Sequence, residues 1–216
     1  MRKIIIDPQI HDHCRLYKTR LQTFIEAFRM RAIQDQIIPL DGKTILDAGC
    51  GHGDILQALW VPNAAFWGAE INHQSVALCT DRFSNKANVN IVETTLEDLP
   101  FESDKFDYII CTEVLEHCVD PDVCLTELCR VLAPFGRIII TVPFENACIA
   151  ARLLLYPFFK PVLGKEYSIV AKTHIAPFDR RRLALLLSRY FQEYSIDSIL
   201  CGFKYLAICT KKTEQK

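Results

Sequence analysis

Short apolar runs alternate with helical patterns along most of the chain. The runs predicted to be strands in the first two thirds are Thr44–Ala48, Ala65–Ile71, Val89–Val92, Tyr108–Cys111 and Arg137–Val142. Between them, residues 53–60, 73–83 and 121–132 carry apolar positions near helical spacing. This alternation predicts right-handed βαβ units, and therefore a parallel sheet covered by helices on both faces.

The last part of the chain has a different pattern. Asp179 to Tyr190 is predicted to be a helix with Asp179 as its N-cap. Two strand-like runs follow, Tyr194–Leu200 and Tyr205–Thr210, and the connection between them is short. Because parallel neighbours need a long crossover, this connection predicts an antiparallel hairpin at the sheet edge. The expected fold class is α/β, with a mostly parallel seven-stranded sheet.

The N-terminal part is predicted to be helical over residues 12–38, and the Pro39-Leu40-Asp41-Gly42 stretch interrupts this pattern. We find no internal repeat or linker, so we expect residues 1–216 to form a single domain with an N-terminal helical segment, 1–40.

Composition narrows the function. The 216 residues are 50% hydrophobic and 24% charged, with a formal net charge of −1, so no electrostatic footprint for nucleic acid is present and none is expected as a partner. No run reaches the length of a membrane-spanning helix, and the N-terminus is not a secretory signal. We therefore expect a cytoplasmic protein.

The ten cysteines do not form C-x-x-C pairs, which argues against zinc-ribbon and thioredoxin-like readings. We expect them to be reduced, and most of them to be small core residues. His11, His13 and Cys14 could ligate a metal, but we interpret this cluster as ordinary surface and expect no metal.

A glycine-rich turn, Gly49-Cys50-Gly51-His52-Gly53, lies between the first predicted strand and the next helix. This is where α/β proteins bind nucleotides, but the G-x-G-x-G spacing differs from the dinucleotide and P-loop patterns. A tight turn with nothing bound is the alternative. Asp47, at the entrance of the turn, would repel a pyrophosphate and suit a cationic ligand.

S-adenosylmethionine is such a ligand, because it carries a sulfonium and an ammonium and no phosphate. Glu70, at the end of the second predicted strand, could accept both hydroxyls of its ribose. Asp98, in the Asp98-Leu99-Pro100 triplet after the third strand, could accept the amine of its adenine.

Taken in order, these motifs resemble those of a known family. The motifs that carry the resemblance are, in family order, Asp47-x-Gly-x-Gly-x-Gly53, Glu70, Asp98-Leu99-Pro100, Thr112-Glu113-Val114-Leu115-Glu116-His117 and Arg130-Val131-Leu132-Ala133-Pro134-Phe135-Gly136. They are similar to those of class I S-adenosylmethionine-dependent methyltransferases, in particular the branch with ubiquinone-biosynthesis O-methyltransferases and many small-molecule enzymes. The resemblance implies a Rossmann-like sheet. Phe135 departs from the family's Pro-Gly-Gly turn.

The resemblance also implies which residues bind the cofactor. Residues expected to hold the cofactor are Asp47, Gly49, Cys50, Gly51, Glu70, Ile71, Asp98, Leu99 and Thr112. A general base helps when the acceptor is a hydroxyl, and the candidates are His117, His174 and Glu113. For His117 we favour a packing or helix-capping role over that of a base. Glu113 and Glu116 could orient an acceptor.

Residues 146–178 form an apolar, aromatic segment where this family places substrate-covering elements. One interpretation is an inserted helix packed on the domain. The other is a lid over a hydrophobic or lipid-like acceptor, with peripheral membrane contact through Arg152, Lys160 and Lys165.

The sequence thus predicts an S-adenosylmethionine-dependent methyltransferase that acts on a small-molecule acceptor, with O-, N- and C-methylation left open. A nicotinamide-dependent oxidoreductase is disfavoured by Asp47 and by the glycine spacing. A non-catalytic cofactor-binding protein or partner subunit is the other alternative.

Overall fold

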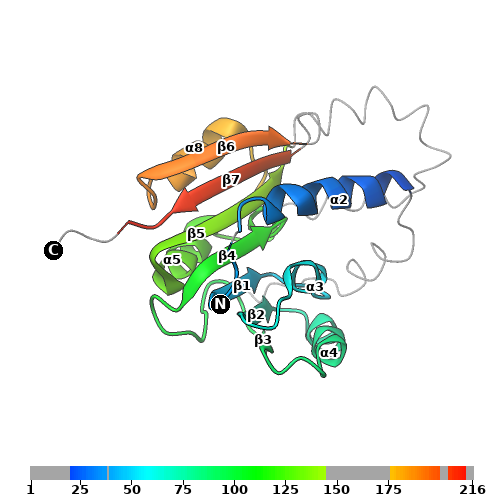
Figure 1. The fold of residues 1–216 in the computed structure, drawn as a ribbon. Coiled ribbons are helices and arrows are strands. Elements are labelled where there is room, and N and C mark those ends of the chain that lie inside the picture. Colours follow the sequence, from blue (N-terminus) through cyan, green and yellow to red (C-terminus); the bar gives the residue numbers. More distant parts are fainter. Residues whose placement is uncertain (1–19, 38, 145–175, 200–203, 213–216) are drawn as a thin grey trace.

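The computed structural model describes residues 20–37, 39–144, 176–199 and 204–212. Its centre is one seven-stranded sheet with the order β3-β2-β1-β4-β5-β7-β6 (Figure 1). The strands are β1 (Thr44–Ala48), β2 (Ala65–Glu70), β3 (Val89–Glu93), β4 (Phe106–Thr112), β5 (Leu132–Pro143), β6 (Glu193–Ile199) and β7 (Lys204–Thr210). β1 to β5 pair in parallel, and β7 runs antiparallel to both β5 and β6. The predicted sheet and its edge hairpin are confirmed.

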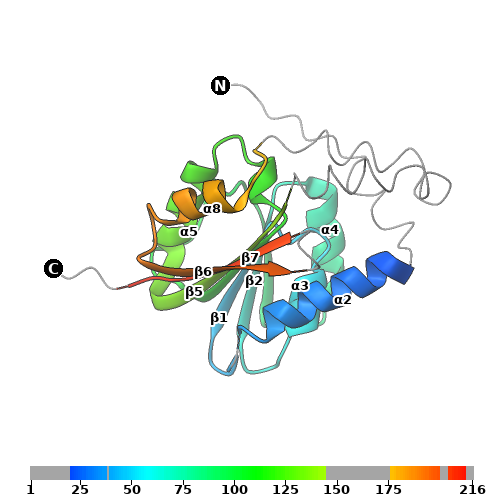
Figure 2. The same cartoon turned by 90° about the horizontal axis from the view of Figure 1, so that it is seen from above.

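Helices cover both faces of this sheet, as the alternation predicted. Figure 2 shows α2, α3 and α4 on one side of the sheet and α5 and α8 on the other. Their bounds are α2 (Arg20–Gln34), α3 (Asp54–Leu59), α4 (His73–Arg82), α5 (Pro121–Val131) and α8 (Arg180–Leu187). One short 3-10 helix, η1 (Leu115–His117), follows β4.

A hydrophobic core lies on each face of the sheet, and this explains why the strands appear in the sequence as apolar runs. Ile45, Phe66 and Ile110 face α2, α3 and α4, whereas Leu46 and Ile109 face α5 and α8, and all five are fully buried. Strands that are covered on both faces have no polar alternation, so they appear in the sequence as nearly continuous apolar stretches.

Element boundaries follow local capping. Asp179 accepts a hydrogen bond from the backbone N–H of Arg182 at 2.7 Å, which confirms it as the N-cap of α8. Asp120 caps α5 in the same way, with Pro121 at the first helical position. β5 begins at Leu132, before the predicted Arg137, because Leu132 pairs with Phe106 ahead of a register shift. Phe135, which stands where the family has a glycine in its Pro-Gly-Gly turn, has a left-handed backbone conformation (φ 62°).

The cysteines of the described residues are free thiols, and all of them except half-buried Cys129 are buried. Burial agrees with their prediction as small core residues. Among the helices that the structure describes, none has both the length and the apolar character needed to cross a membrane. His11, His13 and Cys14 lie outside the described residues.

Candidate functional site

The strand order changes direction between β1 and β4. From β1 the chain proceeds to β2 and β3 on one side, and then returns to β4 on the other. Such a switch point leaves a crevice at the carboxyl ends of the strands, where α/β sheets bind ligands. Asp47 near the end of β1, Glu70 at the end of β2 and Thr112 at the end of β4 all lie at this edge.

The glycine turn is tied directly to β2. The backbone N–H groups of Gly49 and Cys50 donate to the carbonyl of Ala69 at 2.8 and 3.0 Å, and the N–H of Gly53 donates to Cys50 at 2.8 Å. Gly49, Gly51 and Gly53 all have positive φ angles, which only glycine adopts without strain. The turn is therefore held in one shape by the sheet.

Two of these glycines are needed for different reasons. A Cβ at Gly49 would lie 2.4 Å from a side-chain methyl of Val114, so packing within the protein excludes a side chain there. A Cβ at Gly51 would have no heavy atom within 4 Å. Gly51 thus leaves open space beside the turn, where a ligand could approach the main chain.

Asp47 is the least satisfied polar group of the site. Its side chain is 1% exposed, and neither carboxylate oxygen has a hydrogen-bond partner. Burial raises the pKa of Asp47 to about 8, with the negative charges of Glu70 and Asp54 adding to the effect and Arg29 opposing it. The carboxyl is placed where a cationic, hydrogen-bonding ligand would satisfy it.

Glu70 is also buried, but its carboxylate is bonded. One oxygen accepts the N–H of Gly51 at 2.9 Å, and the other accepts the N–H of Asn72 at 2.8 Å. The side chain therefore fastens the glycine turn to the end of β2, a role that the sequence did not suggest. Each oxygen has a second lone pair, so Glu70 can still accept ribose hydroxyls.

The residues predicted to surround the adenine follow β2 and β3. Ile71 directly follows β2 and is 40% exposed, which leaves its side chain available to a ring. Asp98 is exposed, whereas Leu99 is 3% exposed and packs into the core. Asp98 can offer a carboxylate to a ligand, whereas Leu99 contributes mainly to the position of the loop.

Glu113 lies just beyond β4 in a left-handed backbone conformation (φ 57°). Its backbone N–H donates to the carbonyl of Thr141 at 2.9 Å, and the Thr141 hydroxyl donates to its carboxylate at 3.0 Å. The other carboxylate oxygen pairs with the Lys204 ammonium. Burial acts to raise the pKa of Glu113, but the charges of Lys204 and Arg29 prevail and lower it. Glu113 is therefore an ionised, partnered carboxylate.

Glu116 and His117 lie on η1, next to this cluster. Glu116 is 1% exposed, and one of its oxygens lacks a hydrogen-bond partner. Burial and the charge of Glu113 raise the pKa of Glu116 well above its usual value, which favours the neutral form of its carboxyl. His117 is half-buried at the end of η1.

Residues 145–175, which include His174 and the segment 146–172, lie outside the described residues. The described residues on either side of them both lie near the site. Phe144 and Phe178 form a bridge, and the backbone N–H of Ala176 donates to the carbonyl of Glu116 at 3.0 Å. Within the ranges that the structure describes, no group of three or more metal-binding side chains occurs.

The structure thus places Asp47, the glycine turn, Glu70, Thr112 and Glu113 along one sheet edge, with Ile71 and Asp98 toward β3. Sequence reasoning missed Val114, Thr141, Lys204 and Arg29. The position of Lys204 could have been inferred from the predicted hairpin. In an antiparallel pair the first residue of one strand lies beside the last residue of the other, and Lys204 of β7 pairs with Pro143 of β5.

Part of the chain is similar to known proteins. Residues 46–140 match a family model described as a methyltransferase domain. The chain is 29% identical over 144 residues to a ubiquinone biosynthesis O-methyltransferase of Coxiella burnetii, covering 66% of this chain and 58% of that protein. It is 32% identical over 120 residues to a fatty-acid O-methyltransferase of Mycolicibacterium smegmatis, covering 54% and 42%. The chain therefore spans less than two thirds of these curated relatives.

Solved structures show the same fold. A protein of Pyrococcus horikoshii OT3 superposes with a TM-score of 0.70 at 16% identity, over 93% of this chain and 99% of that one. The sheet, its switch point and the family match define a class I, Rossmann-like methyltransferase fold. Over residues 46–140 the chain is thus similar to methyltransferase domains, in a region that takes up less than half of its length.

Proposed function

We propose that this protein transfers a methyl group from S-adenosylmethionine to an oxygen atom of a small hydrophobic acceptor. The observation that carries the cofactor part is Asp47, a fully buried carboxyl with two unsatisfied oxygens beside a glycine turn. An ammonium group is both a cation and a hydrogen-bond donor, so it meets both needs of this residue.

The remaining residues of the turn fit the rest of the cofactor. Gly49, Cys50 and Gly51 would line its methionine end, where Gly51 leaves open space. Glu70 would accept the ribose hydroxyls with its free lone pairs, and Ile71, Asp98 and Leu99 would surround the adenine. When bound, the cofactor supplies a methyl group already activated by its sulfonium.

The protein then has to hold the acceptor in line and exclude water. Glu113 is suited to orienting an acceptor hydroxyl, because its ionised carboxylate accepts a hydrogen bond in a position fixed by Thr141 and Lys204. Its lowered pKa makes it a weak base. Removal of a proton therefore falls to His117 or His174, or is unnecessary when the acceptor is already ionised.

Two considerations favour an oxygen acceptor of hydrophobic character. The relatives named above are O-methyltransferases, one of them acting on fatty acids by its name. The apolar segment 146–172 lies in the sequence between Phe144, which bridges to Phe178, and Ala176, whose backbone N–H donates to the carbonyl of Glu116. This segment would cover the acceptor as a lid, and its basic residues would meet a membrane surface.

Calorimetric titration with S-adenosylhomocysteine and with NAD tests the cofactor. We expect binding of the first and none of the second. Glu193→Gln, an exposed change on β6 at the far side of the sheet, should bind like the wild type. Binding of NAD in place of S-adenosylhomocysteine would contradict the proposal.

Single-turnover transfer of a labelled methyl group to extracted small molecules tests catalysis. Tight binding without any transfer would favour the non-catalytic alternative.

A further inference from the structure

The loop that would contact the adenine has no regular secondary structure of its own. It runs from the end of β3 to the start of β4, and Leu96, Leu99 and Phe101 anchor it in the core. Buried backbone groups in such a loop need partners from elsewhere in the protein. For the residues just after Asp98, those partners are two side chains of α5.

Glu127 and Arg130 hold the loop through three hydrogen bonds to its main chain. The N–H of Leu99 donates to a Glu127 carboxylate oxygen at 3.0 Å. The Arg130 guanidinium donates to the carbonyl of Leu99 at 2.9 Å and to that of Phe101 at 2.7 Å. Both backbone groups of Leu99 are thus bound by α5, one residue beyond the carboxylate predicted to read the adenine amine.

The two side chains also hold each other. Arg130 donates to the two Glu127 oxygens at 2.8 and 2.7 Å, one turn apart on the helix. The hydrogen bond from Arg130 lowers the pKa of Glu127, and the same bond raises the pKa of Arg130, so both groups stay charged. A planar guanidinium that bonds a carboxylate and two carbonyls at once has little freedom to move.

The other side of Asp98 is fixed as well. The hydroxyl of Thr94 donates to the carbonyl of Asp98 at 2.9 Å. Asp98 itself is exposed, so its carboxylate extends from a main chain that is held on both sides. The position of the main chain from which this carboxylate extends is therefore set by bonds that involve no ligand.

We propose that Glu127 and Arg130 are positioning residues that orient Asp98 and so give the site its preference for adenine. This inference rests on the proposed cofactor. It assigns the preference to a pair of side chains on α5 that would not touch the ligand.

The test compares two ligands, S-adenosylhomocysteine and its hypoxanthine analogue, in which an oxygen replaces the adenine amine. The readout is the ratio of their dissociation constants. Because a hydrogen bond to a charged carboxylate distinguishes them, we expect the wild type to prefer the adenine compound by about tenfold or more. Arg130→Met should reduce this preference to about twofold, since Asp98 would no longer be held in place.

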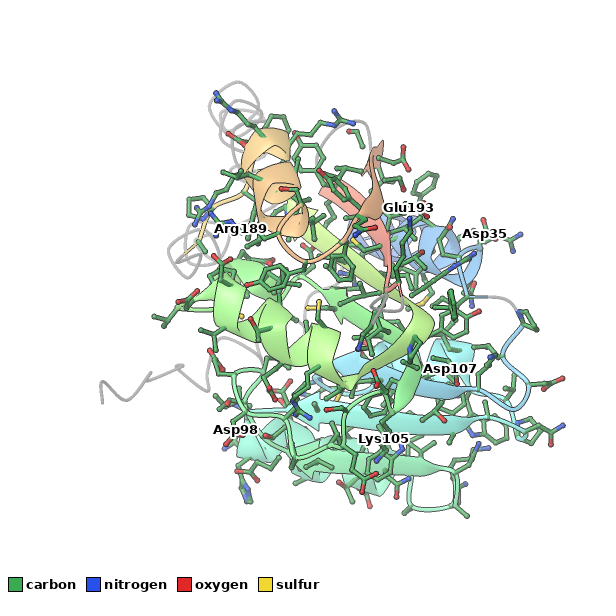
Figure 3. The ribbon with its side chains drawn as sticks, turned by 90° about the vertical axis from the view of Figure 1, so that its left-hand side faces the viewer. Asp35, Asp98, Lys105, Asp107, Arg189 and Glu193 are labelled. Atoms are coloured by element: carbon green, nitrogen blue, oxygen red, sulfur yellow. The ribbon has the colours of Figure 1, made fainter. Side chains whose placement is uncertain are left out.

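Arg189→Met is the matched control. Arg189 pairs with Asp122 at the other end of α5, at 2.8 Å, and Figure 3 shows Arg189 and Asp98 on opposite sides of that helix. This variant should keep the wild-type ratio. A merely structural loss would weaken both ligands equally and leave the ratio unchanged.

Two further variants apply if Arg130→Met does not fold. Arg130→Lys keeps the charge but offers one nitrogen in place of the two that bond the carbonyls, and Glu127→Gln keeps an acceptor for Leu99 without the charge. Both variants should therefore give intermediate ratios. A wild-type ratio in all folded variants, or an equal fall in Arg189→Met, would overturn the inference. A wild type that binds neither ligand would instead overturn the proposed cofactor, and a wild type that binds both equally would show that Asp98 does not select the adenine.

Discussion

Two carboxylates at the carboxyl ends of adjacent strands have opposite surroundings. Asp47 on β1 and Glu113 just after β4 are close in the sheet, since Asp47 pairs in register with Ile110. Burial raises the pKa of Asp47 to about 8, whereas Lys204 and Arg29 overcome burial and lower the pKa of Glu113. Lys204 and Thr141 bond the Glu113 carboxylate, and neither oxygen of Asp47 has a hydrogen-bond partner.

The difference separates a carboxyl that is suited to binding a cationic ligand from one whose charge is balanced by a lysine of the same chain. A buried acid without a hydrogen-bonding partner carries a cost that a cationic ligand can remove on binding. A carboxylate with a lysine partner has its charge satisfied within the chain, so it is suited to orienting an acceptor. The Asp47 region is therefore expected to respond to the cofactor, and the Glu113 region to contribute to stability.

The largest expected effect is on cofactor affinity in Asp47→Asn. The amide keeps the shape of the side chain but removes the charge that an ammonium would meet. We expect the dissociation constant for S-adenosylhomocysteine to rise by about 10- to 100-fold. Calorimetry measures it, and a folded variant with wild-type affinity would contradict the role of Asp47.

Lys204→Met should have the next largest effect, on stability. It leaves Glu113 as a partly buried carboxylate without its lysine, and we expect the free energy of unfolding to fall by about 2 kcal/mol. Urea unfolding measures the change. The double variant Glu113→Gln, Lys204→Met should be more stable than Lys204→Met alone, because no uncompensated charge is left behind. A double variant less stable than Lys204→Met would show that the unpaired Glu113 charge is not the cause of the lost stability.

The pH dependence of binding should separate the two carboxylates. Asp47 must lose its proton to bind a cation, so affinity should rise with pH through the neutral range by up to about tenfold per unit and level off above about pH 8. At pH 7, binding should release about one proton, seen as a dependence of the binding enthalpy on the buffer. Asp47→Asn should abolish this release, and its persistence in that variant would assign the proton to another group.

The smallest expected effect is that of Glu113→Gln on acid stability. Because the folded-state pKa of Glu113 is lowered, its contribution is present above its unfolded value and is lost as pH falls through the folded value. The variant should be about 1 kcal/mol less stable at neutral pH, and this difference should shrink below about pH 4. Thermal unfolding of both proteins from pH 3 to 7 measures it, and a constant difference would argue against ionisation as its origin.

Much of the fold could be predicted because it depends on local patterns. The buried strands appear as apolar runs, Asp179 is a recognisable N-cap, and the short connection before β7 requires antiparallel pairing. β5 was predicted to begin too late, because Leu132 to Gly136 lack strand character and join the sheet through pairing with Phe106. In the site, the glycine turn, Asp47 and Glu70 were visible as a spaced motif, although their binding roles stay predictions.

What the sequence determined by itself was the class of fold and the order of the motifs, since periodicity and residue spacing are properties of the chain. Only the tertiary structure decided which charges meet. Lys204 lies far along the chain from Glu113, yet sheet order brings the two together and lowers the pKa of the carboxylate. Packing against Val114 leaves no room for a side chain at Gly49. Hydrogen bonds from two side chains of α5 hold the loop after β3. Such ion pairs, packing contacts and hydrogen bonds form between residues far apart in the sequence. Their energies depend on distance through space and on burial, which only the folded chain defines.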